Sequence, residues 1–374
     1  MEALNRAERA QFAGSIVPVS GRALLMKRDN TDALGAGESA LDGSNDLGNE
    51  LPQRHDLKQK FGGVARLVLS IALVGALVYF IGSANILTRI EAVRWQTLTL
   101  VTLILASSFL FVTLRWTAIL SALGHRVEST ALFGSVFIGF QLNQLLPTGV
   151  GGDVLRAWRA RQLGVPTDVA IHSVLIDRAA GVLVALVGAV SLLPFVDGRT
   201  QYETLAWIIG IVAVAGLTCC LAAWGISCLP GRPIPWFGQV QRRITELSSS
   251  VAAVATSPRA AFFVFVLACA NQLLPVIAIW LLASELHLSL APLDVGMITL
   301  VSTLAAVIPV SVGGWGVREG ALVYLFGLYG VAPDAAFAVS MLYGASLTFI
   351  AVPGLLMVSI GHVARSFSRE RRST

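Results

Sequence analysis

Two stretches of the sequence, residues 147–156 and 309–318, share the pattern Pro-x-x-x-Gly-Gly-x-x-x-Arg. The shared positions are Pro147, Gly151, Gly152 and Arg156 in the first stretch and Pro309, Gly313, Gly314 and Arg318 in the second. A glycine pair lets the backbone approach another group closely. A helix that starts after the pair points N–H groups and a partial positive charge at the break. An arginine one turn later can hold a phosphate through two hydrogen bonds. The pattern therefore predicts capture of an anionic group rather than bond making.

Each arginine of the pattern has an acidic neighbour. Asp153 lies three residues before Arg156, and Glu319 directly follows Arg318. These carboxylates either balance the charge of the arginine or contact a bound group themselves. Asp153 could also be the N-cap of the helix that follows the first glycine pair. The sequence leaves these interpretations open.

A third pair of charged residues, Asp177 and Arg178, lies about eight residues into an apolar segment, roughly 12 Å along a helix. An ionisable side chain costs about 2.5–3.5 kcal/mol at the centre of a membrane helix, so its presence needs a reason. Adjacent helical residues point about 100° apart, and we therefore expect different partners for the two side chains. They either face a functional interior or form ion pairs that tie this helix to the preceding segment.

The elements that position these residues are predicted to be membrane-spanning helices. Of 374 residues, 55% are hydrophobic and 13% are charged, against about 25% charged in soluble domains. A spanning helix needs roughly 20 apolar residues. Six stretches of this kind lie at about 64–82, 97–114, 170–196, 205–228, 260–283 and 336–361. Two further apolar blocks, 131–163 and 295–331, contain the breaks. We expect an all-α polytopic membrane protein with about eight apolar segments.

The arginines predict how the interrupted blocks sit, because cytoplasmic loops are enriched in basic residues. If 131–163 is a re-entrant hairpin that enters and leaves from the cytoplasm, thirteen arginines lie inside and three outside. The inside set is Arg115, Arg126, Arg156, Arg159, Arg161, Arg232, Arg242, Arg243, Arg259, Arg365, Arg369, Arg371 and Arg372, and the outside set is Arg89, Arg94 and Arg199. A full crossing by 131–147 would instead move the arginine-rich loop 229–259 outside. The count favours the hairpin and makes 295–331 a second hairpin that enters from the outside.

The two breaks thus have opposite predicted orientations, which suggests an inverted repeat of the kind found in many transporters. Non-helical backbone at membrane depth must be buried in protein or line a water-filled cavity. The alternative is that proline and glycine only terminate two unrelated helices. We expect six full spans and two re-entrant helical hairpins in an inverted-repeat arrangement.

Three regions are expected along the chain: a disordered cytoplasmic tail at 1–60, a membrane domain at 61–365 and a short basic cytoplasmic tail at 366–374. Translation could begin at Met1 or at Met26. The four cysteines form no CxxC pair, and neither a metal site nor a cofactor is predicted. The net charge of +5 comes from arginines at the ends of apolar segments, a pattern typical of membrane topology rather than of nucleic-acid binding.

Three motifs in this order resemble a known family. They are residues 142–156 (LNQLLPTGVGGDVLR), 173–178 (SVLIDR) and 308–320 (IPVSVGGWGVREG). They resemble the signature of the lysylphosphatidylglycerol synthase transmembrane family, also called flippase-like, and are similar to the membrane half of the multiple peptide resistance factor. The resemblance covers about residues 60–365.

The resemblance implies a lipid-handling membrane domain with a cavity between re-entrant helices, where a lipid head group crosses. Fused relatives carry a cytosolic aminoacyl-transfer domain that makes the lysyl lipid. This chain ends at Thr374, so the transferase activity is not expected in it. Stand-alone relatives look like translocators of other lipids, and the sequence does not single out one lipid, a direction, an energy source or an oligomeric state.

The leading hypothesis is a translocator in a bacterial inner membrane, with both termini cytoplasmic, that guides an anionic or polar head group of a phospholipid or other polar lipid past Arg156 and Arg318. No catalytic residue is assigned in this hypothesis. The predicted substrate-binding residues are Gly151, Gly152, Asp153, Arg156, Asp177, Arg178, Gly313, Gly314, Arg318 and Glu319.

Two other function classes stay open. One is a lipid-modifying transferase with Asp153, Asp177 or Glu319 as general base, although a carboxylate beside an arginine is a weak base. The other is a membrane scaffold for a separately encoded lipid-synthesis enzyme, in which the breaks are structural. Turnover of a labelled donor would favour the first, and co-purification of a partner without transport would favour the second.

Overall fold

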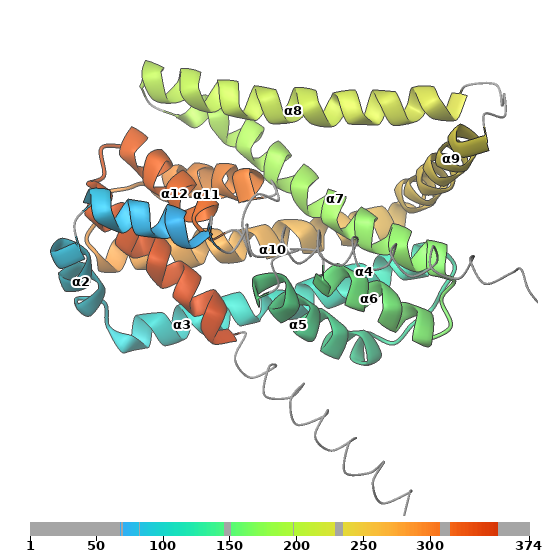
Figure 1. Cartoon of the computed structure of the whole chain (residues 1–374), viewed down its shortest axis with the longest axis horizontal. Helices are drawn as coiled ribbons and strands as arrows, with labels where there is room; N and C mark the ends of the chain where they lie inside the picture. The colour runs from blue at the N-terminus through green and yellow to red at the C-terminus, as the bar shows by residue number, and fades with distance from the viewer. Residues whose placement is uncertain are drawn as a thin grey trace, which may run out of the picture. The chain divides into compact units, whose positions relative to one another are not determined.

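The computed structural model is all-helical in the part of the chain that it describes (Figure 1). The described residues are 68–350 without 69, 82, 146–150, 197, 229–234 and 307–314. Five segments are long and apolar enough to cross a membrane: Trp95–Ala122, Thr167–Phe195, Gln201–Ala222, Pro258–Glu285 and Pro333–Ile350. Ser70–Ile81 is a shorter apolar helix. Five of the six predicted spans are therefore confirmed as helices of spanning length. Both predicted tails, Met26 included, lie outside the described residues.

In the described ranges the chain forms a succession of helices with no strand between them. They are α2 (Ser83–Glu91), α3 (Trp95–Ala106), α4 (Ser108–Ala122), α5 (Ser129–Leu145), α6 (Gly151–Gln162), α7 (Thr167–Leu192), the 3-10 turn η1 (Leu193–Phe195), α8 (Arg199–Cys228), α9 (Pro235–Ala255), α10 (Pro258–Glu285), α11 (Pro292–Ala306) and α12 (Val317–Leu328). Helices α3 and α4 form one candidate span that is interrupted at Ser107.

The described helices flank both predicted breaks, which lie mostly at 146–150 and 307–314 outside the described residues, and Gly151 and Gly152 of the first break already belong to a helix. Helix α5 ends at Leu145 and packs against α6, and α11 ends at Ala306 and packs against α12 (Figure 1). These four helices have 12 to 17 residues. At 1.5 Å per residue each is about 18–26 Å long, shorter than the roughly 30 Å hydrocarbon core. Each block is therefore a pair of short packed helices rather than one span with a kink.

Helix ends follow from local backbone chemistry. Helix α6 is followed by Gly164, whose φ of +90° is a conformation that favours glycine. The Val165 N–H closes the last turn on the Ala160 carbonyl oxygen at 3.1 Å. Pro166 then precedes α7, and Pro258 is the first residue of α10, where a missing N–H costs nothing. The α6–α7 turn is consequently short, and it holds the arginine of the first break beside α7.

The prediction for Arg115 is wrong. The sequence predicts it in a cytoplasmic loop after a span that ends at residue 114, but the helix continues to Ala122 and buries the Arg115 side chain. The physical reason is that Asp177 of α7 compensates the charge. An arginine with a buried partner does not have to leave the apolar segment.

The interior is built around α4, α10 and α11. Helix α4 packs along α10, with Trp116 and Leu120 from one helix and Ile279 and Leu282 from the other fully buried. Helix α11 is buried on nearly every face from Val295 to Ser302. An apolar helix that is buried all round belongs to the centre of a membrane protein.

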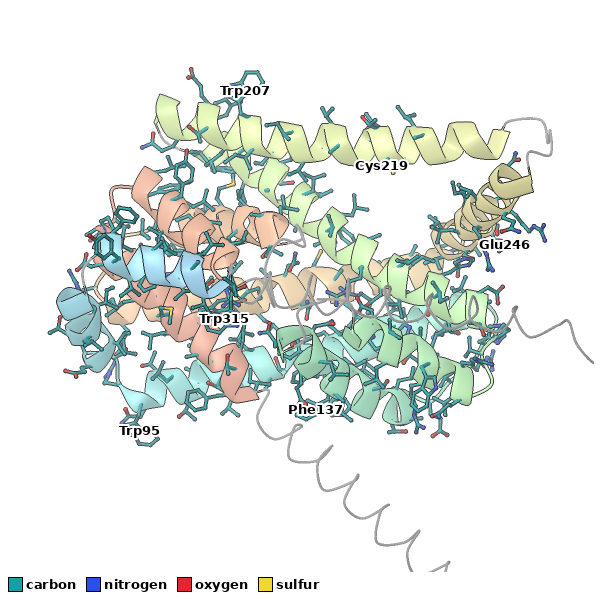
Figure 2. All side chains as sticks on the ribbon, in the orientation of Figure 1. Trp95, Phe137, Trp207, Cys219, Glu246 and Trp315 are labelled. Atoms are coloured by element: carbon teal, nitrogen blue, oxygen red, sulfur yellow. The ribbon has the colours of Figure 1, made fainter. Side chains whose placement is uncertain are left out.

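Helix α8 shows the opposite pattern. Trp207 projects from it and is 74% exposed (Figure 2), and Ile211, Val214 and Leu217 are exposed along the same helix. A continuous apolar surface of this kind has to be covered by another apolar phase. Lipid is the covering that the length and composition of the helix imply.

Polar contacts join helix ends that are distant in the sequence. Arg94 pairs with Glu285 at 2.6 Å, and Arg89 pairs with Asp334 at 3.2 Å. At the opposite helix ends, His172 of α7 contacts Ser250 of α9 at 3.0 Å. These contacts tie the helix ends together, and the predicted sidedness stays a prediction.

We expect Gly152→Ala to destabilise the α5–α6 pair. A Cβ at Gly152 would overlap the carbonyl oxygen of Gly139, and neither backbone can move without shifting its helix. Overpacking of this kind costs about 1–3 kcal/mol. The midpoint of thermal aggregation in detergent, followed by size-exclusion chromatography, measures the loss. Gly134→Ala on the same α5 is the matched control, because a Cβ there has no neighbour within 4 Å. Equal midpoints for the two variants would contradict the close approach.

Candidate functional site

The first break is held together by two glycines and an asparagine. Gly139 of α5 lies against Gly152 of α6, so that the two backbones touch. The Asn143 side-chain oxygen accepts a hydrogen bond from the Gly152 N–H at 2.8 Å. It thereby satisfies one of the N–H groups that a helix start leaves free. Gly152 is thus engaged in packing and capping, and the ligand contact predicted for Gly151 and Gly152 stays a prediction.

A buried carboxylate joins three helices beside this break. Asp177 of α7 accepts from Arg115 Nε of α4 through Oδ1 at 2.6 Å and from Arg156 Nη2 of α6 through Oδ2 at 2.8 Å. All three side chains are buried. Hydrogen-bonded pairs of opposite charge are the form in which ionised groups tolerate a low-dielectric interior. Of the two interpretations left open for Asp177, the ion pair that ties α7 to the preceding segment is present, and Arg115 is a second arginine that the sequence did not assign to it.

The Arg156 guanidinium is also stacked on an aromatic ring. Its Cζ lies 4.5 Å from the centre of the Trp116 ring. The Trp116 indole N–H donates to Ser173 Oγ at 3.0 Å, and the Ser173 hydroxyl donates to the Ala170 carbonyl oxygen. Stacking of this kind attracts a cation to the ring face. The two contacts fix the plane of the guanidinium.

Asp153 and Arg178 form a second pair next to this cluster. Arg178 Nη2 lies 3.0 Å from Asp153 Oδ1, and Arg156 Nη1 lies 3.8 Å from the same oxygen. Asp177 and Arg178 therefore have different partners, as predicted. The N-cap role considered for Asp153 is wrong, because α6 already begins at Gly151 and the capping side chain is Asn143.

Side-chain exposure falls steadily along this set of charges. It is 55% for Arg178, 18% for Asp153, 6% for Arg156 and 2% for Asp177. The charged groups thus lead from the surface of the helix bundle to its interior. Further inside, Gln272 of α10 donates to the Gly181 carbonyl oxygen of α7 at 3.2 Å, about one turn beyond Asp177.

Two hydrogen-bond donors of the buried cluster are free. Arg115 Nη1 and Arg156 Nε are buried and have no hydrogen-bond partner among the described residues. An unpaired donor costs about 1–3 kcal/mol in an interior, and more when the group is charged. The cluster can therefore donate to a further oxygen atom from a ligand.

The second break satisfies its charges locally. Glu319 Oε1 accepts from Arg318 Nε at 3.0 Å, and Glu319 Oε2 accepts from the Gly316 N–H at 2.6 Å. Arg318 also lies over the rings of Trp315 and Tyr343, at 5.1 Å and 5.3 Å from their centres. Trp315 lies at the start of α12 (Figure 2). Gly313 and Gly314 lie outside the described residues, as do Pro147 and Pro309.

The site residues that the sequence did not single out come from the spans next to the interrupted blocks. Arg115 and Trp116 lie on α4, which precedes the first block, and Tyr343 lies on the span that follows α12. One observation could have found Arg115. It is a lone arginine within an otherwise apolar run, which marks a buried ionisable group. Among the described residues, no group of three or more His, Cys, Asp and Glu side chains could hold a metal ion.

Five long apolar helices, an outward apolar surface and buried ion pairs at a helix break define a multi-pass α-helical membrane protein. The chain belongs to the lysylphosphatidylglycerol synthase transmembrane region family, whose sequence pattern matches residues 63–354. The resemblance of the three motifs is thereby confirmed.

Two archaeal proteins are similar over most of their length. A UPF0104 membrane protein of Methanothermobacter thermautotrophicus is 23% identical over 302 residues, which are 73% of this chain and 86% of the relative. A UPF0104 membrane protein of Methanocaldococcus jannaschii is 20% identical over 294 residues, 74% of this chain and 88% of the relative. Both are membrane proteins, and a bacterial host for this chain stays a prediction.

We expect Asp177→Asn to destabilise the protein by about 3–5 kcal/mol, because it leaves two buried guanidiniums without a counter-charge. The shift of the thermal midpoint in detergent measures this loss. Glu246→Gln is the matched control. Glu246 pairs with the exposed Arg243 at 3.9 Å, and exposed pairs contribute at most about 1 kcal/mol. A midpoint for Asp177→Asn equal to that of the control would mean that the carboxylate does not hold the cluster together.

Proposed function

We propose that this protein is a lipid translocator that moves an anionic or polar head group past the first break, along the charged residues of α4, α6 and α7. The observation that supports the proposal most is the buried set of Arg115, Arg156 and Asp177, which leaves two arginine donors free among the described residues. A buried, incompletely paired guanidinium is unfavourable in isolation. It becomes favourable when an anionic oxygen binds to it.

In this proposal the graded exposure of the charges is the entry path. The head group first meets Arg178 and Asp153 and then reaches Arg156 and Arg115. The acyl chains stay in the hydrocarbon phase, along exposed apolar residues of α7 such as Leu183 and Val187. Only the polar part of the lipid then needs a polar environment, so the chains never leave the bilayer.

We further propose that α5–α6 and α11–α12 are re-entrant hairpins related as an inverted repeat. All four helices are too short to span a bilayer alone, and each packs against its partner. In this proposal both termini are cytoplasmic, as the distribution of arginines predicts. Opposed hairpins that meet near the midplane are a common architecture of transporters.

The two breaks have different roles in this proposal. Arg156 binds the head group, whereas Arg318 is held by Glu319, Trp315 and Tyr343 and closes the second break. This assignment separates the two arginines that the sequence treats alike. It also disfavours Asp177 as a general base, because arginines occupy both of its oxygens.

Head-group translocation in proteoliposomes tests the function. Fluorescent phosphatidylglycerol and a zwitterionic phosphatidylcholine are placed in both leaflets, and the outer leaflet is bleached with dithionite. We expect the wild type to expose inner-leaflet phosphatidylglycerol, and the Arg115→Gln/Arg156→Gln variant to do so at least about tenfold more slowly, since truncating one partner of a buried charge pair costs about 2–5 kcal/mol.

The control is Arg242→Gln/Arg243→Gln, which removes the same two charges from the exposed face of α9. All variants are first shown to elute as single folded species. Equal rates for wild type, control and cluster variant would reject the translocator role of the cluster. A wild type that matches empty liposomes for both lipids would reject translocation of these lipids.

A further inference from the structure

We infer that Asp177 sets the charge of the head group that the first break accepts, and that the accepted group carries one negative charge, as a phosphodiester does. The inference deepens the proposed function and rests on it, because it takes the bound group to be a lipid head group. The inference goes beyond the proposed function by assigning a specificity-determining role to one buried carboxylate.

The geometry makes Asp177 a fixed counter-charge rather than a mobile one. Each of its two oxygens accepts from a different arginine, at 2.6 Å and 2.8 Å, and the two arginines come from different helices. Rotation of the carboxylate would break both hydrogen bonds. The negative charge of Asp177 therefore stays in the cluster while a ligand comes and goes.

The charges around the break do not cancel. The buried set comprises the guanidiniums of Arg115 and Arg156 and the carboxylate of Asp177, which gives a net charge of +1, and the more exposed Arg178 and Asp153 pair with each other. Within the described ranges, Asp177 forms ion pairs with Arg115 and Arg156 and with no other residue. An interior that excludes water penalises a net charge, and one negative charge on a ligand removes it.

The free donors show where that ligand charge would bind. Arg115 Nη1 and Arg156 Nε belong to side chains that are only 6% exposed, and neither has a partner among the described residues. Both arginines are already positioned by the Asp177 carboxylate that they share. Each of these donors can bind an oxygen of an oxyanion, as the guanidiniums that bind phosphates do.

The count of charges distinguishes classes of ligand. A phosphodiester carries one negative charge and neutralises the site. A phosphomonoester carries about −1.5 to −2 near neutral pH and leaves an excess negative charge in the interior. A zwitterionic head group brings a cation that finds no free carboxylate oxygen on Asp177, because arginines occupy both.

Changing Asp177 should therefore change selectivity and not only affinity. Asp177→Asn raises the net charge of the set to +2 and should favour a dianionic ligand. Arg115→Gln/Asp177→Asn restores +1 and should favour a monoanionic ligand again, with one arginine fewer. This double variant removes one of the two buried arginines and leaves Arg156 with Asp153 at 3.8 Å, so both Asp177 variants are first shown to elute as single folded species.

The experiment is a calorimetric titration of the purified full chain in detergent at pH 8 with short-chain lipids. The probes are dihexanoyl phosphatidylglycerol as the monoanion, dihexanoyl phosphatidic acid as the dianion and dihexanoyl phosphatidylcholine as the zwitterion. Dimethyl phosphate, a phosphodiester without acyl chains, tests whether a free anion is sufficient. The Arg242→Gln variant on α9 is the control for a change of overall charge.

We expect wild type and double variant to bind the monoanion more tightly than the dianion, and folded Asp177→Asn to reverse this ratio by at least about tenfold, the size of coupling between close charges. The same ratio in wild type and in both variants would overturn the inference. Binding that follows this rule without translocation would support the inference and reject the proposed function. Dimethyl phosphate binding as tightly as the lipid would overturn the assignment of the ligand to a lipid.

Discussion

A carboxylate held between two guanidiniums connects the helices on which the candidate site depends. Asp177 on α7 binds Arg115 on α4 and Arg156 on α6, so a single pair of oxygens fixes three helices relative to one another. In a low-dielectric interior neither arginine could be buried without it. The continuation of α4 past residue 114, the position of α6 and the stacking of Arg156 on Trp116 all follow from this compensation.

The two breaks show how one sequence pattern can serve different chemistry. At the first break the carboxylate comes from another helix and is shared, so two arginines together keep free donors. At the second break the carboxylate comes from the adjacent residue, Glu319, which also caps the start of α12 through the Gly316 N–H. There the Arg318 guanidinium pairs with Glu319 and lies over the rings of Trp315 and Tyr343. An arginine that is paired by its own neighbour in this way contributes structure, and an arginine with a free donor can contribute binding.

Much of the architecture could be predicted from the sequence, because it depends on local properties. The length of the apolar segments predicts the spans, and the proline followed by paired glycines predicts the breaks. The angle of about 100° between adjacent helical residues predicts that Asp177 and Arg178 have different partners. The contacts of Arg115 with Asp177 and of Trp116 with Ser173 could not be predicted, since they join residues 62 and 57 positions apart. The capping of Gly152 by Asn143 is unpredictable for another reason. The sequence favours Asp153 as the capping residue, but the oxygen that accepts from the Gly152 N–H belongs to Asn143 of the preceding helix.

The position of Trp116 has a consequence for how the interior could be observed. Its ring is buried, fixed by Ser173 and in direct contact with the guanidinium that is nearest to the break. The emission of an indole depends on the electric field along its ring, and at this position that field is dominated by one cation and its counter-charges. Trp116 is one of eight tryptophans in the chain, and a variant that keeps it alone would carry an intrinsic optical reporter beside the charge cluster.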